Sequence, residues 1–355
     1  MKRLPGIFIP ARNAQKTLKL LSVMQLKLDG FQLRRTAELV GIPLAHSPSA
    51  QDQNILKREL GSYHVHEAPF EPIPTRPGNL RDAVHEMVPS HLVAQLPRSF
   101  DIIGDIAIIE LSPELEDYSA EVGKGVLQIS PHVRLVLRKT GEVMGKFRTR
   151  KLQAVAGSGG TETVHREFHC QYHLDVSSVY FNPRLAHERR RVAEQVKEDE
   201  VVVDMFAGVG PYSILVAKLQ PHSKVYAVDI NPSAIKYLKQ NILANDVADR
   251  VIPLLGDARA LSQSVLQGTA DRVIMNLPSE AQQYLDAALH ALKSAGGLVH
   301  FYRFTQRDEA LDVVVREFRT LVAAQRREVQ SVNYSKVIKE VAPSKVQVAL
   351  DALIK

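Results

Sequence analysis

The sequence predicts an α/β protein whose C-terminal half is built around a doubly wound parallel sheet. From about residue 184 onward, short apolar strand patterns alternate with helix patterns, which indicates parallel strands joined by crossover helices. The run "VVVDMFAGVGPYSILVA", residues 201–217, passes from a buried strand through a glycine turn directly into a helix. The segments before residue 184 are instead rich in strands that end at glycine turns, which is typical of an antiparallel α+β region.

The pattern along the chain predicts three domains and a linker. Residues 1–70 combine the helical pattern "QKTLKLLSVMQL" with the alternating strand "SYHVHEAPF" and predict a small α+β domain. The proline-rich stretch of residues 71–80 predicts a linker. Residues 81–183 predict a basic α+β middle domain. Residues 184–355 predict the α/β domain, in which "REVQSVNYSKVI" and "SKVQVALDALI" add a C-terminal antiparallel strand.

The composition is that of a globular protein with a basic surplus. The 355 residues carry a formal net charge of +6, and no run approaches the roughly 18 apolar residues of a membrane span. Pro10 and Arg12 break the N-terminal apolar run, so we expect no signal peptide. Cys170 is the only cysteine, which excludes an internal disulfide and favours a cytoplasmic location. A basic surplus is common in soluble proteins and also suits a phosphate-rich partner.

The end of the first strand of the α/β domain predicts a ligand site. Ligands of open α/β sheets bind at the carboxyl ends of the strands, and glycines such as Gly208 and Gly210 let backbone approach a ligand. A dinucleotide fingerprint would need a third glycine in register and would place a pyrophosphate at the helix start. The sequence lacks that glycine, and Asp204 would repel a pyrophosphate but suit an ammonium group.

Two more acids close the next two strands. Asp229 in "VYAVDIN" is placed to accept hydrogen bonds from ribose hydroxyls, and Asp257 in "LLGDAR" is placed to meet an adenine amino group. A glycine turn with strand-end caps is common in α/β proteins. Together with acids on three successive strands, however, it predicts a class I S-adenosylmethionine methyltransferase fold, with no metal. The predicted cofactor contacts are Asp204, Phe206, Gly208, Gly210, Asp229, Ile230, Asp257 and Asn276.

The fourth strand ends in "DRVIMNLPSE", and in this fold its tip faces the transferred methyl group. Asn276 offers an amide oxygen, and the turn frees backbone carbonyls at Leu277 and Pro278, so that these groups can hold the N–H edge of a base. The turn lacks the stacking aromatic that accompanies methylation of exocyclic amines, which favours an aromatic ring nitrogen as the acceptor. The alternative is that Pro278 only terminates the strand.

A ring nitrogen that carries a proton must lose it as the methyl group arrives, which calls for a base and for a nearby cation. The stretch "VYFNPRLAHERRRVA" supplies Glu188 among arginines that keep it ionised. The alternative for these arginines is a solvated, charge-paired helix face. Tyr180 and Phe181 can stack on a splayed base, or lie in a core. A second cluster predicts a positive wall for phosphate contacts: Arg134, Arg138, Lys139, Lys146, Arg148, Arg150 and Lys151.

Four strings in order resemble the archaeal and eukaryotic tRNA (guanine-37, N1)-methyltransferase family: "VYFNPRLAHERRRVAEQV", "VVVDMFAGVGPYSI", "VDINPSAIKYLKQNI" and "DRVIMNLP". The resemblance extends from about Ser99 to the C-terminus, including "GKFRTR" and "TETVHRE", and is weaker over residues 1–70. It implies methylation of N1 of the guanosine that follows the anticodon in tRNA, with S-adenosylmethionine as methyl donor. We expect a monomer with no membrane association.

The same resemblance assigns roles to individual residues. It implies that Glu188 is the base for the N1 proton and that Arg148 stabilises charge on guanine O6, while Asn276 and Pro278 fix the base edge. The small N-terminal domain is expected to touch the outer corner of the tRNA. The residues that hold the anticodon loop are then Tyr180, Arg184 and Arg189.

Other functions stay open at this stage. Some relatives also methylate a carbon of the tricyclic wyosine base at the same position, which the sequence does not exclude. A tRNA aminocarboxypropyltransferase would use the same cofactor, but the turn at Asn276–Pro278 argues against it. The intact Asp204, Asp229 and Glu188 argue against a non-catalytic RNA-binding protein. The missing third glycine argues against a nicotinamide-dependent oxidoreductase.

Overall fold

The chain divides into two units, Met1–Pro77 and Gly78–Lys355. The computed structural model describes residues 1–36, 38–73, 77–145, 147, 149–309 and 311–355. Within these ranges no helix is both long and apolar enough to cross a membrane. The division falls inside the predicted linker of residues 71–80.

The first unit is an α+β fold, as predicted. Its strands form an antiparallel sheet in the order β2-β3-β1-β4: β1 (Lys2–Pro10), β2 (Arg34–Arg35), β3 (Leu39–Pro43) and β4 (His64–Phe70). Helix α1 (Ala14–Val23) and helix α2 (Ala50–Leu60) complete the unit. Helix α2 begins at Ser49, whose hydroxyl accepts a hydrogen bond from the Asp52 N–H while the Asp52 carboxylate accepts one from the Ser49 N–H.

Residues 78–157 form a second small α+β region. Its sheet has the order β5-β6-β7-β8, in which β6 and β7 are parallel and the other pairs antiparallel. Its elements are α3 (Leu80–Val84), β5 (Asp101–Ile103), β6 (Ile106–Ile109), α4 (Ser119–Ile129), β7 (Leu135–Met144) and β8 (Thr149–Gly157), with short 3₁₀ turns at Val93–Gln95 and Pro113–Tyr118. Val122 and Val126 of α4 are fully buried against this sheet.

A hairpin follows, made of β9 (Glu162–Glu167) and β10 (Cys170–Asp175). It packs on helix α7 (Pro232–Ala244) of the C-terminal region, where Asn241 Oδ1 accepts from the His173 N–H (2.7 Å) and Asn245 Oδ1 from the Gln171 N–H (2.9 Å). The predicted boundary between residues 183 and 184 stays a prediction, but the hairpin is joined to the C-terminal region within the unit of residues 78–355. The physical reason is that side-chain amides of the C-terminal region supply the hydrogen bonds that the free edge of β10 lacks.

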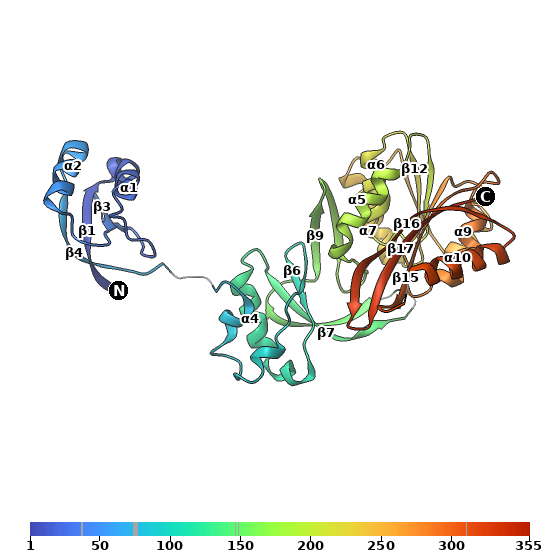
Figure 1. The fold of residues 1–355 in the computed structure, drawn as a ribbon, viewed down its shortest axis with the longest axis horizontal. Helices are drawn as coiled ribbons and strands as arrows, with labels where there is room; N and C mark the ends of the chain where they lie inside the picture. The colour runs from blue at the N-terminus through green and yellow to red at the C-terminus, as the bar shows by residue number, and fades with distance from the viewer. Residues whose placement is uncertain (37, 74–76, 146, 148, 310) are drawn as a thin grey trace. The chain divides into compact units, whose positions relative to one another are not determined.

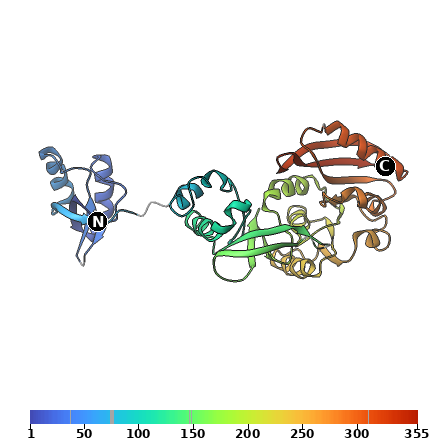
Figure 2. The same cartoon turned by 90° about the horizontal axis from the view of Figure 1, so that it is seen from below.

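The C-terminal region contains a seven-stranded sheet in the order β13-β12-β11-β14-β15-β17-β16. The first five strands are parallel, and β17 pairs antiparallel with both β15 and β16. The strands are β11 (Val201–Asp204), β12 (Lys224–Asp229), β13 (Val251–Leu255), β14 (Arg272–Met275), β15 (Gly297–Gln306), β16 (Val329–Ala342) and β17 (Lys345–Ile354). The predicted class I fold is confirmed, and the expected C-terminal strand is a pair of long strands at one edge of the sheet (Figures 1 and 2).

Helices cover both faces of this sheet (Figure 1). Helices α5 (Ala186–Gln195), α6 (Pro211–Leu219) and α7 share one apolar core, and α8 (Ala258–Ser262), α9 (Leu285–Ala291) and α10 (Leu311–Ala324) share another. The strand period of two explains this division. Val202 of β11 lies in the first core and Val203 in the second.

Candidate active site

A cavity of about 500 Å³ lies at the carboxyl ends of the parallel strands. Nine of the sequence-predicted site residues line it: Tyr180, Arg189, Phe206, Gly208, Asp229, Ile230, Asp257, Asn276 and Pro278. Four others, Arg184, Glu188, Asp204 and Gly210, are not among the lining residues. Arg148 lies outside the residues that the structure describes. A cavity of this size is typical of a small-molecule or cofactor site.

The glycine turn after β11 forms one wall of the cavity. Gly208 and Gly210 have positive φ angles of 55° and 91°, a conformation that side chains other than glycine disfavour. A Cβ on Gly208 would meet only the Tyr180 carbonyl, at 3.7 Å, whereas a Cβ on Gly210 would lie 2.4 Å from Leu238. Gly208 therefore leaves room on the cavity side for a ligand, and Gly210 allows α6 to approach α7.

Asp229 ties this turn to the end of β12. Its Oδ2 accepts a hydrogen bond from the Gly208 N–H (2.7 Å) and its Oδ1 accepts one from the Asn231 N–H (2.8 Å). Burial raises the pKa of Asp229, against the effect of these hydrogen bonds. Each carboxylate oxygen keeps a further lone pair, so Asp229 can also accept from a ligand hydroxyl.

Asp257 and two aromatic rings continue the wall. Asp257 caps the N-terminus of α8, because its Oδ1 accepts from the Arg259 N–H (2.9 Å). Phe206 and Tyr284 meet edge to face with ring centroids 5.1 Å apart, and both line the cavity. These groups place an apolar aromatic surface beside a carboxylate in the cavity lining, which suits a nucleoside base. The lining residues at the ends of β11, β12, β13 and β14 are here called the strand-end rim: Phe206, Gly208, Asp229, Ile230, Asp257, Asn276 and Pro278.

Asp204 does not line the cavity. Its side chain is fully buried, its Oδ2 accepts a hydrogen bond from the Ser213 hydroxyl (2.7 Å), and its Oδ1 has no hydrogen-bond partner among the described residues. Burial raises the pKa of Asp204 to about 7. The predicted contact with a ligand ammonium group is therefore not supported by this geometry, because the carboxylate turns under α6 towards Ser213.

At the end of β14, Asn276 and Pro278 line the cavity as predicted. The Asn276 Oδ1 accepts a long hydrogen bond from Gln347 Nε2 (3.4 Å). The backbone carbonyls at this turn are already used within the protein, since Leu277 O accepts from the Glu280 N–H (3.0 Å) and Pro278 O from the Phe304 N–H (3.2 Å). Each carbonyl oxygen keeps a second lone pair, so their contact with a base edge stays a prediction, and Asn276 is the polar side chain that this turn presents.

The predicted tRNA-contact residues differ in their surroundings. Tyr180 is partly exposed at the cavity. Arg189 is buried and donates two hydrogen bonds to the Glu167 carboxylate, at 2.7 and 2.6 Å. Arg184 donates to Asp101 of β5 (2.6 Å). Both arginines therefore hold protein segments together in this structure.

Glu188 lies behind the cavity wall. Its carboxylate accepts hydrogen bonds from Arg191 Nη2 (2.6 Å), Arg191 Nε (2.8 Å) and the Tyr302 hydroxyl (2.7 Å). The whole residue is 8% exposed. The sequence predicted arginines beside Glu188, and the structure shows that Arg191 is the one that pairs with it.

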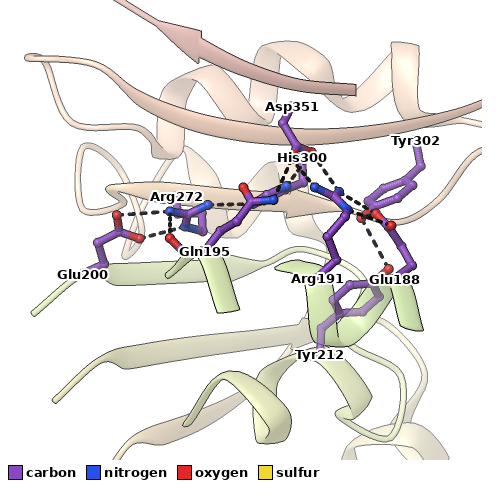
Figure 3. A network of polar contacts seen from close by, with 9 residues as sticks. All are labelled: Glu188, Arg191, Gln195, Glu200, Tyr212, Arg272, His300, Tyr302 and Asp351. Atoms are coloured by element: carbon purple, nitrogen blue, oxygen red, sulfur yellow. Dashed lines mark hydrogen bonds and ion pairs between the residues drawn. The ribbon is translucent and has the colours of Figure 1, made fainter. Parts of the chain in front are cut away.

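Glu188 is one end of a buried charge ladder, defined here as Glu188, Arg191, Asp351, His300, Arg272 and Glu200 (Figure 3). Arg191 bridges Glu188 and Asp351, and His300 lies between Asp351 Oδ1 (2.7 Å from Nδ1) and Arg272 Nη1 (2.8 Å from Nε2). Because a guanidinium only donates, Nε2 accepts and Nδ1 carries the proton. Burial lowers the pKa of His300, which keeps the ring neutral.

Three residues of the second basic cluster are paired within the protein. Arg134 donates to Asp105 (2.8 Å), and Arg138 and Lys139 form ion pairs with Glu116 (3.1 Å) and Glu110 (2.7 Å). Lys146, like Arg148, lies outside the described residues. The structure does not support the predicted positive wall at the three paired positions.

Sequence reasoning missed the contribution of the C-terminal strands to the cavity. Phe304, Lys345 and Gln347 line it, and Lys345 Nζ lies 5.0 Å from the centre of the Phe304 ring. A polar glutamine in the mostly apolar strand "KVQVALDALI" was the available signal. Gln347 is 3% exposed, so it needs a hydrogen-bond partner, which Asn276 provides.

Comparison with known proteins places these features in a family. A family model described as the TRM5/TYW2 methyltransferase domain matches residues 163–331, and one described as the TYW2 N-terminal domain matches residues 80–161. The chain is 42% identical over 346 residues to tRNA (guanine(37)-N(1))-methyltransferase Trm5b of Pyrococcus abyssi, covering 98% of both chains. It is also similar to a solved complex of aTrm5 with tRNALeu, with a TM-score of 0.74, 30% identity and 99% of each chain covered.

A solved structure of Trm5 from Methanocaldococcus jannaschii in complex with adenosine shares the fold, with a TM-score of 0.64, 28% identity and 98% of each chain covered. The chain is also 33% identical to the 4-demethylwyosine(37)-methyltransferase Taw21 of Saccharolobus solfataricus, a match that covers 72% of this chain and 93% of the relative. A similar match, at 32% identity over 77% of this chain, is to an aminocarboxypropyltransferase of Pyrococcus horikoshii. The match along nearly its full length to the Pyrococcus abyssi enzyme confirms the predicted resemblance: the chain belongs to the TRM5/TYW2 family of methyltransferases.

Proposed function

We propose that this protein transfers the methyl group of S-adenosylmethionine to N1 of guanosine 37 in tRNA. The observation that carries the proposal is the cavity at the strand-end rim, where Asp229 and Asn276 face the same space. Relatives named as guanine-37 N1-methyltransferases support the choice of substrate.

The residues of the cavity fit the cofactor. Gly208 leaves space at the wall and presents no side chain, Asp229 offers lone pairs for ribose hydroxyls, and Phe206 with Tyr284 offers an apolar surface for adenine. When bound, S-adenosylmethionine supplies an electrophilic methyl group on a sulfonium centre. We assign the cofactor contacts to the strand-end rim, with Gly210 shaping the turn and Asp204 positioning α6 through Ser213.

The target base needs a partner for its edge and an acceptor for its proton. Asn276, held by Gln347, is the side chain that fixes the base edge, next to Pro278. As the methyl carbon bonds to N1, the N1–H bond breaks and Glu188 is the final acceptor of that proton. We assign to Arg148 the stabilisation of the charge that develops on O6.

Recognition of the tRNA is assigned to several parts of the chain. Tyr180 at the cavity rim is suited to stack on the splayed nucleotide. Arg184 and Arg189 are assigned to the anticodon loop. In that role each guanidinium must contact the RNA while it also keeps its carboxylate partner, Asp101 for Arg184 and Glu167 for Arg189. We assign the outer corner of the tRNA to the first unit, Met1–Pro77. A tRNA substrate suits a cytoplasmic location, and we propose that the protein acts as a monomer.

The test uses purified protein, S-adenosylmethionine with a tritiated methyl group, and an unmodified tRNA transcript with guanosine at position 37. We expect label in the tRNA and N1-methylguanosine in the digested nucleosides, and no label in a matched transcript with adenosine at position 37. Label in the adenosine transcript, or a different modified nucleoside, would contradict the proposal. A second substrate, a tRNA that carries 4-demethylwyosine at position 37, tests the two alternative reactions. The mass of the modified nucleoside distinguishes carbon methylation from aminocarboxypropyl transfer.

A further inference from the structure

The cavity contains a lysine to which the proposed reaction gives no role. Lys345 is the first residue of β17 and lines the cavity, as does Gln347 two residues later. Side chains two residues apart in a strand lie on the same face of the sheet, about 7 Å apart along the strand. Gln347 donates a hydrogen bond to Asn276, the side chain assigned to the base edge. Lys345 therefore lies one step along β17 from the residue that holds Asn276.

The ring of Phe304 links Lys345 to the same turn at the end of β14. Phe304 pairs with Gln347 across β15 and β17, and its N–H donates to the Pro278 carbonyl (3.2 Å). The Lys345 Nζ lies 5.0 Å from the centre of the Phe304 ring. An ammonium group is attracted to the face of an aromatic ring. Phe304 therefore favours a position of this ammonium group at the cavity.

The positive charge of Lys345 is available to a ligand. Lys345 is exposed, and within the described ranges of the chain it forms no ion pair. Two arginines close to it in the fold differ in this respect. Arg307, whose N–H donates to the turn before β17, is paired with Glu340 (2.9 Å), and Arg189 in the cavity wall is paired with Glu167 (2.6 Å).

The acidic residues of the cavity restrict where a phosphate can bind. Three carboxylates line the cavity, and each of them repels a phosphate when ionised: Asp229, Asp257 and Glu280. A nucleotide whose base enters the cavity brings its own phosphates with it. A lysine is a compact cation that suits a phosphate oxygen. Beside Lys345 the phosphate gains an opposite charge, whereas beside the strand-end acids it would meet like charges.

We propose that Lys345 binds one of the two phosphates that flank guanosine 37, and so anchors the target nucleotide while its base lies at Asn276. This inference rests on the proposed function, since it concerns the nucleotide that is methylated. The contact is electrostatic and forms when the tRNA binds. Its loss should therefore weaken tRNA binding and reduce the dependence of that binding on salt.

The first test measures the dissociation constant of the guanosine-37 transcript at several salt concentrations for Lys345→Met and Lys345→Arg. We expect Lys345→Met to raise the dissociation constant about 10-fold, the scale of one charge-assisted hydrogen bond. The slope of log affinity against log salt should become shallower by about 0.7, the value for one phosphate of a single strand. Lys345→Arg keeps the charge and should keep the wild-type slope.

The matched control is Lys224→Met. Lys224 Nζ lies 5.2 Å from the centre of the Tyr226 ring, so it has a similar contact with an aromatic side chain. Lys224 begins β12 and therefore lies at the end of the parallel sheet opposite to the cavity. We expect the wild-type dissociation constant and salt slope for this variant. A loss equal to that of Lys345→Met would show a general effect of net charge and would overturn the proposal.

The second test identifies the phosphate. Two full-length tRNAs each carry one uncharged methylphosphonate linkage, on the 5′ or the 3′ side of guanosine 37. We expect one of them to bind the wild-type protein more weakly than the unmodified tRNA, and to bind Lys345→Met no more weakly than the unmodified tRNA does. Such coupling is the evidence for a direct contact.

The outcomes that contradict the proposal are distinct. If both methylphosphonates have the same effect on the wild type and on Lys345→Met, the contact does not exist. An unchanged salt slope together with a raised dissociation constant for S-adenosylmethionine would assign Lys345 to the carboxylate of the cofactor and overturn the proposal. A wild-type protein that shows the coupling but forms no N1-methylguanosine would overturn the proposed function and leave the phosphate contact standing.

Discussion

The strand-end rim and the buried charge ladder belong to the same C-terminal region, but they are assembled in different ways. The rim collects the residues that follow successive parallel strands, so each is placed by its own strand end. The ladder joins side chains that are far apart in sequence, such as Arg191 and Asp351, which are separated by 160 residues. The rim is therefore a property of local sequence and topology, whereas the ladder is a property of the folded core.

The two regions also differ in what a mutation should change. The rim faces the cavity, so its substitutions should alter ligand affinity. The ladder is held by paired polar side chains that are mostly buried, so its substitutions should alter stability. Glu188 is the exception, because it belongs to the ladder and is also assigned to the reaction.

The largest expected effect tests that exception. Glu188→Gln should lower the single-turnover methyl-transfer rate by about 10²–10⁴-fold, because the final proton acceptor is lost. Binding of S-adenosylmethionine, measured by equilibrium dialysis, should not change. The matched control is Glu194→Gln on the same helix, where the exposed pair with Arg190 predicts a wild-type rate. A rate for Glu188→Gln within threefold of the wild type would remove Glu188 from the reaction.

The next largest effect should come from the far end of the ladder. Arg272→Met removes the donor to Glu200 and His300 and leaves Glu200 without its buried partner. The free energy of unfolding in urea should fall by about 3–5 kcal/mol. For comparison, Arg190→Met breaks the pair with Glu194, in which both side chains are 54% exposed. This variant should lower the free energy of unfolding by about 1 kcal/mol or less. Equal losses for the two variants would contradict the contrast between buried and exposed pairs.

Asp204 predicts a pH dependence of stability. Its pKa in the folded protein is raised to about 7, above its value in the unfolded chain, so the folded state binds more protons between about pH 4 and pH 7. The contribution of protonated Asp204 to the free energy of unfolding is therefore fully present below about pH 4, and it is lost as the pH rises through 7. From pH 5 to pH 8, the free energy of unfolding of the wild type should therefore fall by about 3 kcal/mol more than that of Asp204→Asn.

The control for this measurement is Asp249→Asn, which removes an exposed carboxylate near the surface. Its stability curve between pH 5 and pH 8 should run parallel to that of the wild type. Parallel curves for the wild type and Asp204→Asn would show that Asp204 is not the titrating group.

The smallest expected effect is on the rim itself. Asp229→Asn keeps one acceptor for the Gly208 N–H but removes the charge that strengthens a hydrogen bond from a ribose hydroxyl. The dissociation constant for S-adenosylhomocysteine, measured by titration calorimetry, should rise by about 10-fold. An unchanged dissociation constant would place the nucleoside elsewhere in the cavity.

The difference between rim and ladder also explains what the sequence could predict. Glycine turns and strand-end acids are local signals, and the parallel topology brings them to one edge, so Gly208, Asp229 and Asp257 all line the cavity. The direction of a side chain at that edge is not a local property. Asp204 ends its strand as predicted but turns under α6, and the Leu277 and Pro278 carbonyls each accept a hydrogen bond from a neighbouring N–H group.

The ladder could not be predicted from the sequence. His300 and Asp351 occupy strand patterns that otherwise look apolar, and nothing local shows that they face each other across β15 and β17. Their partners are set by strand register, which depends on how the whole sheet packs. The same holds for Tyr302, whose contact with Glu188 spans 114 residues.

The most direct test of the account is a crystal structure of this protein with S-adenosylhomocysteine. We expect the ligand in the cavity of about 500 Å³, with its ribose at Asp229, its adenine between Phe206 and Asp257, and its sulfur towards Asn276. A ligand bound outside the strand-end rim, or oriented with its adenine at Asn276, would contradict the central claim that this edge of the sheet delivers the methyl group.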